Sequence, residues 1–391
     1  MFRQLLCHHH QPTDEELDIL KFGLSHSIYP PKVNKSDVYV AFEQIHYLAS
    51  KKIKNKNLSG QLVSELSHLC HSYVSSYQPS PRDLKKHKVL KNPRKNKNIV
   101  LLKPDIGNGV VILDRRDYDL GIQNIIQDRS KFKPLSQDPT LQREGKLQRP
   151  LRKFNKKGHF EDDDYSRIYP KGSNPARIYG LLKMRKPRQQ GAVPLFRPIV
   201  SSIGAYNYNL AKYLCNLLTP LIPAEFCVED SFSIVNEIQK LSMHNKFMVS
   251  FDVEILFTNI PLEESIDLAV SYITQYTNTT FSTKELKDLL HIATAQSHFS
   301  FYGSFYDQID GVAMGSPLAP VLANLFMGHH EREWLQNFGL TEVLFYRRYV
   351  DNTFCLFHSE ADAVQFFHYL NSRHINIRFT MEKESETGCL F

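Results

Sequence analysis

The stretch Y-R-R-Y-V-D-N-T-F-C-L-F, residues 346–357, decides the fold. Two β-prone runs enclose Asp351 and Asn352, and an acid beside an amide is typical of a tight turn. We therefore predict a β-hairpin that reverses at Asp351-Asn352. The same hairpin would hold the Asp351 carboxylate out at its tip, where it could meet a metal ion.

A second carboxylate ends another predicted strand. The run K-F-M-V-S-F-D-V, residues 246–253, indicates a buried strand with Asp252 near its end and the carbonyl of Val253 beside it. Taken alone, an aspartate at a strand end is usually a cap or turn residue. If both strands lie in one antiparallel sheet, the carboxylates of Asp252 and Asp351 converge, and they repel unless a cation lies between them. Two such metal ions would serve a phosphoryl-transfer reaction.

Two further stretches are candidates for phosphate or base contacts. Residues 310–325 place Gly315 and Ser316 before a proline-initiated helix, where small residues allow close approach of a ligand or simply cap the helix. Lys183 and Arg197 lie on β-prone runs separated by Gln190-Gly191. These two cations could grip a triphosphate, although each alone is more typical of a surface charge.

Composition favours a nucleic-acid partner. The 391-residue chain is 42% hydrophobic with a net charge of +7, and residues 168–224 contain no Asp or Glu but eight Lys and Arg residues. The six cysteines form no C-x-x-C pair, which excludes a zinc ribbon and fits a reducing compartment. No window approaches the roughly 18 apolar residues of a membrane span, so we expect a soluble, intracellular protein without a membrane partner.

Periodicity predicts an α+β protein rather than a doubly wound one. Helices are expected within residues 14–78, 207–218 and 317–335, and strands at 99–102, 110–113, 246–253 and 343–357. The basic run 81–98 is interpreted as a solvated linker or as an arm along a nucleic-acid backbone. The opposed charges of residues 143–164 predict an exposed or partly disordered insert.

The order of these motifs strongly resembles the reverse transcriptases of Penelope-like retroelements. The succession runs from K-P-D-I-G-N-G-V-V-I-L-D (103–114) through R-P-I (197–199), F-D-V-x-x-L-F-T-N-I-P (251–261) and G-V-A-M-G-S-P-L-A-P (311–320) to Y-V-D-N-T-F (349–354). The resemblance implies the palm and fingers of a right-hand polymerase and an RNA-directed DNA polymerase activity. It also implies Mg²⁺ or Mn²⁺ as cofactor, and an RNA template, a DNA or RNA primer and deoxynucleoside triphosphates as partners.

The resemblance also implies a role for each matching residue. Asp252 and Asp351 would be catalytic and bind the two metals, with the Val253 carbonyl and, more weakly, Asn352 as further ligands. Phe257 would lie under the sugar and exclude a 2′-hydroxyl. The remaining assignments are the triphosphate contacts Lys183 and Arg197, the nucleotide-pocket residues Gly315 and Ser316, and the primer–template contacts Met314, Tyr349 and Val350.

The sequence departs from the family pattern at several positions. Asn352 replaces the usual second aspartate, Ile106 stands where lysine is usual, and Glu254-Ile255 stands where the family shows an apolar residue and serine. The pattern predicts a helical extension with a basic linker (1–98), fingers with part of the palm and the charged insert (99–245), and a palm (246–391) that stops before a thumb. The alternative function is a catalytically impaired, nucleic-acid-binding remnant of a decayed element. The family's association with chromosomes suggests a nuclear destination.

Overall fold

The computed structural model describes residues 5–383 except for 7–8, 25, 27–29, 54, 108, 185–191, 229, 243, 296 and 310. The chain forms two compact units. Unit 1 comprises residues 1–121 and 181–197, and unit 2 comprises residues 122–180 and 198–391. The expected turn at Gln190-Gly191 lies outside the described residues. The functional borders predicted at 98/99 and 245/246 stay a prediction.

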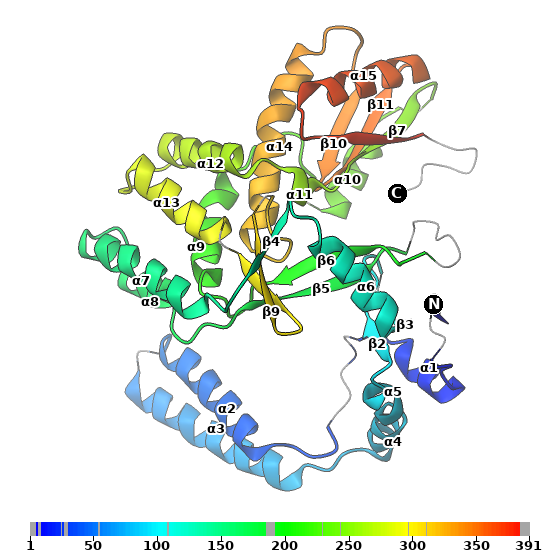
Figure 1. The fold of residues 1–391 in the computed structure, drawn as a ribbon. Helices are drawn as coiled ribbons and strands as arrows, with labels where there is room; N and C mark the ends of the chain where they lie inside the picture. The colour runs from blue at the N-terminus through cyan, green and yellow to red at the C-terminus, as the bar shows by residue number, and fades with distance from the viewer. Residues whose placement is uncertain are drawn as a thin grey trace. The chain divides into compact units, whose positions relative to one another are not determined.

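Unit 1 begins with the helical region that periodicity predicts. Helices α1 (Asp14–Leu20), α2 (Lys35–Ser50) and α3 (Lys56–Ser76) follow one another, and α2 lies beside α3 (Figure 1). A three-stranded sheet has the order β1-β3-β2, formed by β1 (Leu5–Leu6), β2 (Ile99–Leu102) and β3 (Val111–Asp114). The antiparallel β2–β3 pair confirms the expected hairpin-like unit.

The basic run 81–98 is largely helical, and its role as a linker or as an arm along a nucleic-acid backbone stays a prediction. It folds into α4 (Pro81–Val89) and α5 (Lys91–Lys95). The Ser80 hydroxyl accepts a hydrogen bond from the Asp83 N–H and Pro81 occupies the first turn, which are strong signals for a helix start. Leu90, between the two helices, is buried against Ile99 and Val110. The charge density concealed these local signals.

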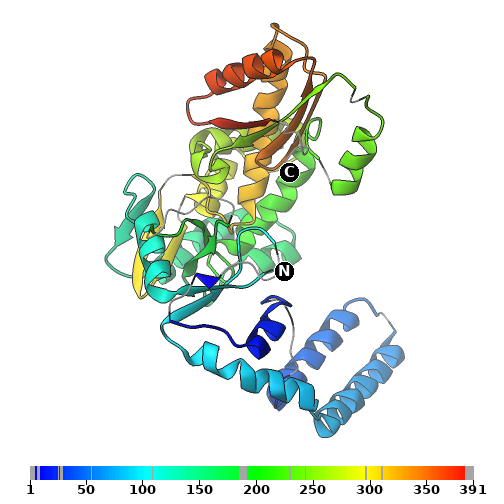
Figure 2. The same cartoon turned by 90° about the vertical axis from the view of Figure 1, so that its right-hand side faces the viewer.

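Unit 2 contains a four-stranded sheet of order β10-β11-β7-β12, of which Figure 1 labels β7, β10 and β11. Its strands are β7 (Phe247–Val253), β10 (Phe345–Tyr349), β11 (Asn352–Phe357) and β12 (Phe379–Lys383), all paired antiparallel. Helices α14 (Leu318–Asn337) and α15 (Glu360–Arg373) pack on one face through Phe326 and Phe366, which share a core with Val249 and Phe251 of β7. Figure 2 shows α15, in red, beside this sheet.

Side chains alternate between the two faces of that sheet. Val249, Phe251 and Val253 face the helices, so Ser250 and Asp252 project to the opposite face. The candidate acid of β7 is therefore separated from the helical core by the sheet itself.

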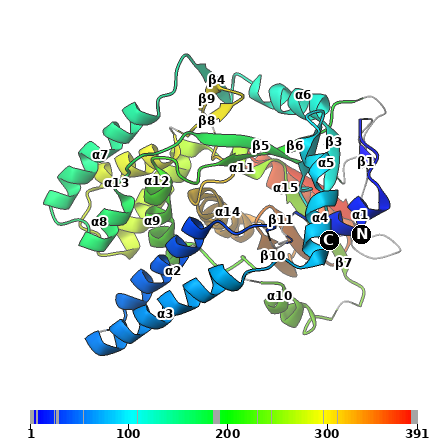
Figure 3. The same ribbon diagram turned by 90° about the horizontal axis from the view of Figure 1, so that it is seen from below.

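The rest of unit 2 is a helical layer and a five-stranded sheet, of which residues 181–182 and 196–197 belong to unit 1. The sheet has the order β4-β9-β8-β5-β6, with strands β4 (Phe132–Leu135), β5 (Ala176–Leu182), β6 (Phe196–Ser201), β8 (His298–Phe301) and β9 (Ser304–Gln308). Helices α9 (Tyr208–Leu218), α12 (Leu262–Tyr276) and α13 (Thr283–Thr294) contact one another, as Figure 3 shows. Further elements are α6 (Arg115–Ile126), whose first part belongs to unit 1, α10 (Ser231–Ile238), α11 (Leu256–Asn259) and a 3₁₀ turn at Thr219–Leu221.

The prediction that residues 143–164 form an exposed or partly disordered insert is wrong. These residues belong to α7 (Thr140–Lys156) and α8 (Asp162–Ile168). Leu147, Leu151 and Phe154 recur at helical spacing and are almost fully buried in a core with α9, α12 and α13. The acidic residues 162–164 form the first turn of α8, where the helix dipole favours negative charge.

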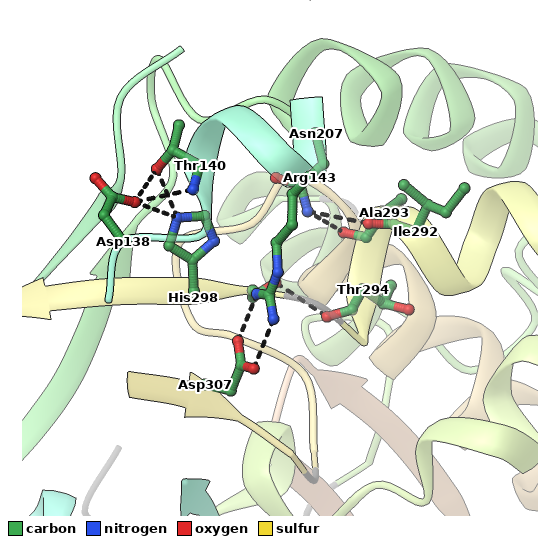
Figure 4. A network of polar contacts seen from close by, with 10 residues as sticks. Asp138, Thr140, Arg143, Asn207, Ile292, Ala293, Thr294, His298 and Asp307 are labelled. Atoms are coloured by element: carbon green, nitrogen blue, oxygen red, sulfur yellow. Dashed lines mark hydrogen bonds and ion pairs between the residues drawn. The ribbon is translucent and has the colours of Figure 1, made fainter. Parts of the chain in front are cut away.

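A polar network fixes α7 to the five-stranded sheet (Figure 4). Arg143 donates two hydrogen bonds to the carboxylate of Asp307 in β9, at 2.5 and 2.7 Å. The ring of His298 in β8 contacts the Thr140 hydroxyl at 2.9 Å. Asn207 also donates to the carbonyl oxygens of Ile292 and Ala293, each at 3.2 Å.

The prediction of an α+β fold is confirmed, because helices and largely antiparallel sheets coexist without a regular βαβ repeat. Within the part of the chain that the structure describes, no helix combines the length and the apolar character needed to cross a membrane.

Candidate active site

The two candidate acids meet at one end of the four-stranded sheet. Asn352 is directly opposite Asp252 in the antiparallel β11–β7 register, and the Val253 N–H donates to the Asp351 carbonyl at 2.8 Å. Both aspartates are half-buried. The prediction that strands bearing Asp252 and Asp351 share one antiparallel sheet is confirmed.

The turn of the hairpin is formed by Val350 and Asp351, not by the predicted Asp351 and Asn352. Tyr349 pairs with Asn352, so the two loop residues are Val350 and Asp351, and Asn352 is already the first residue of β11. Val350 has a φ of 57°. A positive φ at the first loop residue is the pattern of a type II′ turn, which usually requires glycine there. Asn352 is held by strands on both sides and is not free to form the turn.

Two β-branched residues beside the acids have left-handed backbone. Val350 precedes Asp351, and Ile255, with a φ of 49°, follows the end of β7. Such conformations cost about 1–3 kcal/mol each and persist only where the surroundings enforce them. Strained backbone therefore adjoins both strand ends that carry the candidate acids.

Asn352 has a hydrogen-bond partner that the sequence analysis missed. The Ser250 hydroxyl donates to Oδ1 of Asn352 at 2.7 Å. Strand alternation signals this contact, because Ser250 is two residues before Asp252 and lies on the same face. A carboxylate at position 352 could accept the same bond. The departure from aspartate therefore removes a charge from the site without removing this link between β11 and β7.

Phe257 lies in α11, shortly after Asp252. Its half-buried ring packs against both hydrophobic cores of unit 2, and its carbonyl accepts a hydrogen bond from the Val312 N–H at 2.8 Å. The position is thus firmly held, while a role in sugar selection stays a prediction.

The small residues after Met314 are packed against β6. Gly315 has a φ of 115°, and an added Cβ would lie 2.3 Å from the Val200 carbonyl oxygen. The Val200 N–H donates to the Met314 carbonyl at 2.7 Å, and the buried Ser316 hydroxyl accepts from the Leu318 N–H at 3.3 Å. Glycine is required at position 315 because the backbone of β6 lies too close for a side chain. Contacts of these residues with a base pair stay a prediction.

The predicted triphosphate contacts belong to the other unit. Lys183 follows β5 and its N–H donates to the Leu195 carbonyl at 3.0 Å, while Arg197 is in β6. Both residues are in unit 1, whereas Asp252 and Asp351 are in unit 2. Their joint action on one ligand therefore stays a prediction. The exposed side chain of Tyr349 belongs to unit 2 and adjoins the hairpin loop.

The donors at the sheet end fit a hard divalent cation. The Asp252 and Asp351 carboxylates, the Val253 carbonyl and the Asn352 amide offer oxygen atoms from adjacent strand ends. Mg²⁺ and Mn²⁺ prefer such ligands, and two adjacent carboxylates supply the charge that attracts them.

A second group with metal-ligand chemistry is explained by hydrogen bonds. Glu264, His330 and His374 place their donor atoms within 4.8 Å of one another. The Asn376 N–H donates to Nδ1 of His374 at 3.2 Å, so the ring proton is on Nε2, which faces Glu264 at 3.2 Å. Burial lowers the pKa of His330, which also favours a neutral ring. Hydrogen bonds among these three residues join α12, α14 and the segment after α15.

Residues 192–384, just under half of the chain, match the family model described as "Reverse transcriptase (RNA-dependent DNA polymerase)". This part of the chain resembles a reverse transcriptase domain. The matched region includes β7, β10 and β11 and therefore both candidate acids. The matched family consists of nucleotidyltransferases. No curated protein matches the chain.

Solved structures support the fold. Telomerase from Candida albicans, in complex with a TWJ fragment of telomeric RNA, superposes with a TM-score of 0.51 at 11% identity, covering 96% of this chain and 61% of that one. Telomerase from Candida Tropicalis with the same kind of fragment gives 0.52 at 10% identity, with 96% and 58% covered. The chain thus spans about three fifths of these proteins. The matched region has the α+β palm and fingers fold of polymerases.

Proposed function

We propose that the chain is an RNA-directed DNA polymerase of the Penelope-like kind, extending a DNA or RNA primer on an RNA template. The observation that carries the proposal is the β7–β11 pairing, which brings Asp252 and Asp351 to one end of one sheet inside the region that matches the reverse transcriptase family. The motif order from Lys103 to Phe354 supports the Penelope-like assignment.

In this proposal the reaction takes place at the end of the four-stranded sheet that carries Asp252 and Asp351. Asp252, Asp351 and the Val253 carbonyl would hold two Mg²⁺ or Mn²⁺ ions, and Asn352 would contribute a weaker, neutral oxygen. The chemistry that these ions supply when bound is support of the attacking 3′-hydroxyl and of the departing pyrophosphate. Tyr349 and Val350, beside Asp351 in the hairpin, place the primer end. Most of the rate enhancement comes from positioning and charge, because phosphoryl transfer needs little covalent help from the protein.

Residues outside the sheet end would select the nucleotide. Lys183 and Arg197 bind the triphosphate by charge-assisted contacts. Met314, Gly315 and Ser316 line the templating pair. The proposal places the protein inside the cell, with a nuclear destination inferred from the family alone.

Primer extension tests the proposal. The 391-residue chain is incubated with a primed RNA template, the four deoxynucleoside triphosphates and Mg²⁺ or Mn²⁺. We expect templated extension that falls at least about 100-fold in Asp252→Asn, because the substitution removes a charge that the ions require. Extension that survives unchanged in Asp252→Asn would contradict the assignment of the site.

Phe257 gives a second, independent prediction. Phe257→Ala should admit ribonucleotides, because space opens where the proposal puts the 2′-hydroxyl. The measurement is the ratio of kcat/KM for a deoxynucleotide and its ribonucleotide, which we expect to fall about 10-fold or more. Leu256, the fully buried neighbour of Phe257, supplies the control Leu256→Met, which should keep the ratio. An unchanged ratio in Phe257→Ala would remove this role.

One observation favours a second candidate function, a nucleic-acid-binding remnant without turnover. Position 352 bears a neutral amide whose oxygen already accepts the Ser250 hydroxyl. The variant Asn352→Asp separates the two functions in the same extension assay. A polymerase should extend in both forms, and more efficiently with aspartate. Retained RNA binding with no extension by either protein would establish the remnant.

A further inference from the structure

A buried ion pair lies beneath the candidate hairpin, on the face that packs against α14. Arg348 is 0% exposed and Glu331 is 1% exposed. Nε of Arg348 donates to Oε1 of Glu331 at 2.6 Å, and the hydroxyl of Tyr346 donates to the same oxygen at 2.6 Å. Tyr346 and Arg348 are two residues apart on β10 and so project to the same face, opposite to Tyr349.

The guanidinium of Arg348 reaches the hairpin loop as well. Its Nη1 donates to the carbonyl of Val350 and to Oδ1 of Asn324 in α14, each at 2.8 Å. Nη2 contacts Sγ of Cys227 at 3.3 Å. The planar guanidinium of Arg348 thus contacts α14, Cys227 in the segment beside β10, and Val350, which precedes Asp351.

The carbonyl that Arg348 holds belongs to the strained residue of the loop. Val350 has the left-handed φ of 57° that is unfavourable for a β-branched side chain. Asp351 follows it directly, and the Asp351 carbonyl in turn accepts the Val253 N–H at 2.8 Å from the strand of Asp252. Hydrogen bonds and the peptide bond between Val350 and Asp351 therefore connect Glu331 to the candidate metal ligands.

The charge state of this network is fixed. Burial alone would lower the pKa of Arg348, but the charge and hydrogen bond of Glu331, together with Cys227 and Tyr346, outweigh it and the pKa is raised. Burial and the same carboxylate raise the pKa of the Tyr346 hydroxyl well above its usual range. Arg348 stays a cation and Tyr346 a hydrogen-bond donor across the pH range in which polymerases work.

We propose that Arg348, anchored by Glu331, is a positioning residue that holds Val350 in its strained conformation and thereby sets the place of the Asp351 carboxylate. The inference rests on the proposed polymerase function for its effect on rate. Arg348 touches neither substrate nor metal. It acts through the Val350 carbonyl, and an error of about 1 Å at a catalytic group can cost about 100-fold in rate.

Removing one partner of the ion pair would leave a buried charge and destabilise the fold, so the main test removes the whole network. The triple variant Tyr346→Phe, Arg348→Met and Glu331→Leu replaces it with apolar side chains, a change that commonly preserves stability. Arg348→Lys keeps the charge but lacks the fork that reaches Glu331, Asn324 and Val350 together. Arg347→Met is the matched control, because Arg347 lies on the other face and pairs with the half-exposed Glu237 at 2.7 Å.

Two measurements follow. Single-nucleotide incorporation should show kcat reduced about 10- to 100-fold in the triple variant and in Arg348→Lys, with the Kd for primer–template within about two-fold of the original. Hydrogen exchange should be at least about 10-fold faster at the Val253 amide, while the amides of Val249 and Phe251 earlier in β7 keep their protection. Arg347→Met should change neither quantity.

The two readouts keep this proposal separate from the proposed function. A folded triple variant with an unchanged kcat and unchanged exchange at Val253 would overturn the positioning role. If the original chain does not polymerise, the proposed function fails. Faster exchange at Val253 in the variants would then still support positioning of the hairpin, and unchanged exchange would overturn it.

Discussion

Two arginine–carboxylate pairs in unit 2 have similar chemistry and different surroundings. Arg143 and Asp307 join α7 to β9 near the surface, with side chains 13% and 14% exposed. Arg348 and Glu331 lie inside the core under the β10–β11 hairpin, 0% and 1% exposed. The hydrogen bonds of the first pair link α7 to β9, whereas Arg348 of the second pair also holds the loop next to Asp351. The pair near the surface therefore stabilises the fold, whereas the pair under the hairpin is proposed to position the site as well.

The buried pair should show the largest effect on stability. Glu331→Gln leaves the Arg348 cation in the core without its counter-charge, which commonly costs about 3–5 kcal/mol. Equilibrium denaturation in urea measures this loss as a fall in the midpoint. The triple apolar variant is the control and should recover most of the loss. A Glu331→Gln protein as stable as the original would show that water reaches this pair.

The pair near the surface should matter less and should spare the chemistry. Arg143→Met leaves the Asp307 carboxylate without its two hydrogen bonds, and we expect a loss of about 1–3 kcal/mol in the free energy of unfolding. Extension by the folded variant should keep its kcat. Arg149, exposed on the same helix, supplies the control Arg149→Met, expected within about 0.5 kcal/mol of the original. A large fall in kcat for Arg143→Met would erase the contrast between the pairs.

An exposed pair extends the comparison to the smallest effect. Lys157 donates to Glu285 at 2.6 Å, and this bond, with that from the Ser282 N–H, lowers the pKa of Glu285 from 4.5 to about 2. A lowered pKa in the folded state adds stability above pH 4.5 that is lost as the pH falls through about 2. Glu285→Gln preserves the capping box with Ser282 while removing the charge.

The expected difference between the original and Glu285→Gln is below about 1 kcal/mol at pH 7, because Lys157 is half-exposed and water screens the pair. Thermal unfolding from pH 7 to pH 2 measures it. The two proteins should converge toward pH 2. A difference that stays constant over this range would show that the hydrogen bond, rather than the charge, stabilises the fold.

Local patterns predicted much of the fold and of the candidate site. The strand around Phe251, the hairpin around Asp351 and the helix after Pro317 follow from periodicity and turn chemistry. The antiparallel β7–β11 pairing confirms that one sheet carries both acids at one end. The prediction was wrong in the densely charged segment 143–164. The buried stripe of Leu147, Leu151 and Phe154 is visible at helical spacing, but the surrounding cations suggested a loop.

Other features depend on long-range contacts and could not be predicted from local patterns. The turn begins at Val350 because Asn352 is paired on both sides and Arg348 holds the Val350 carbonyl. Glu331 and Arg348 are 17 residues apart on different elements, and nothing in either segment alone indicates that they pair. Alternation along β10 does indicate that Arg348 faces the same side as the buried Tyr346.

The most direct test of the account is primer extension on an RNA template with Mg²⁺, comparing the original chain with Asp351→Asn. The account predicts templated addition of deoxynucleotides by the original chain and a loss of at least about 100-fold in the variant, with primer–template binding retained. Equal extension by both proteins would contradict it, as would the absence of extension by the original chain with either Mg²⁺ or Mn²⁺.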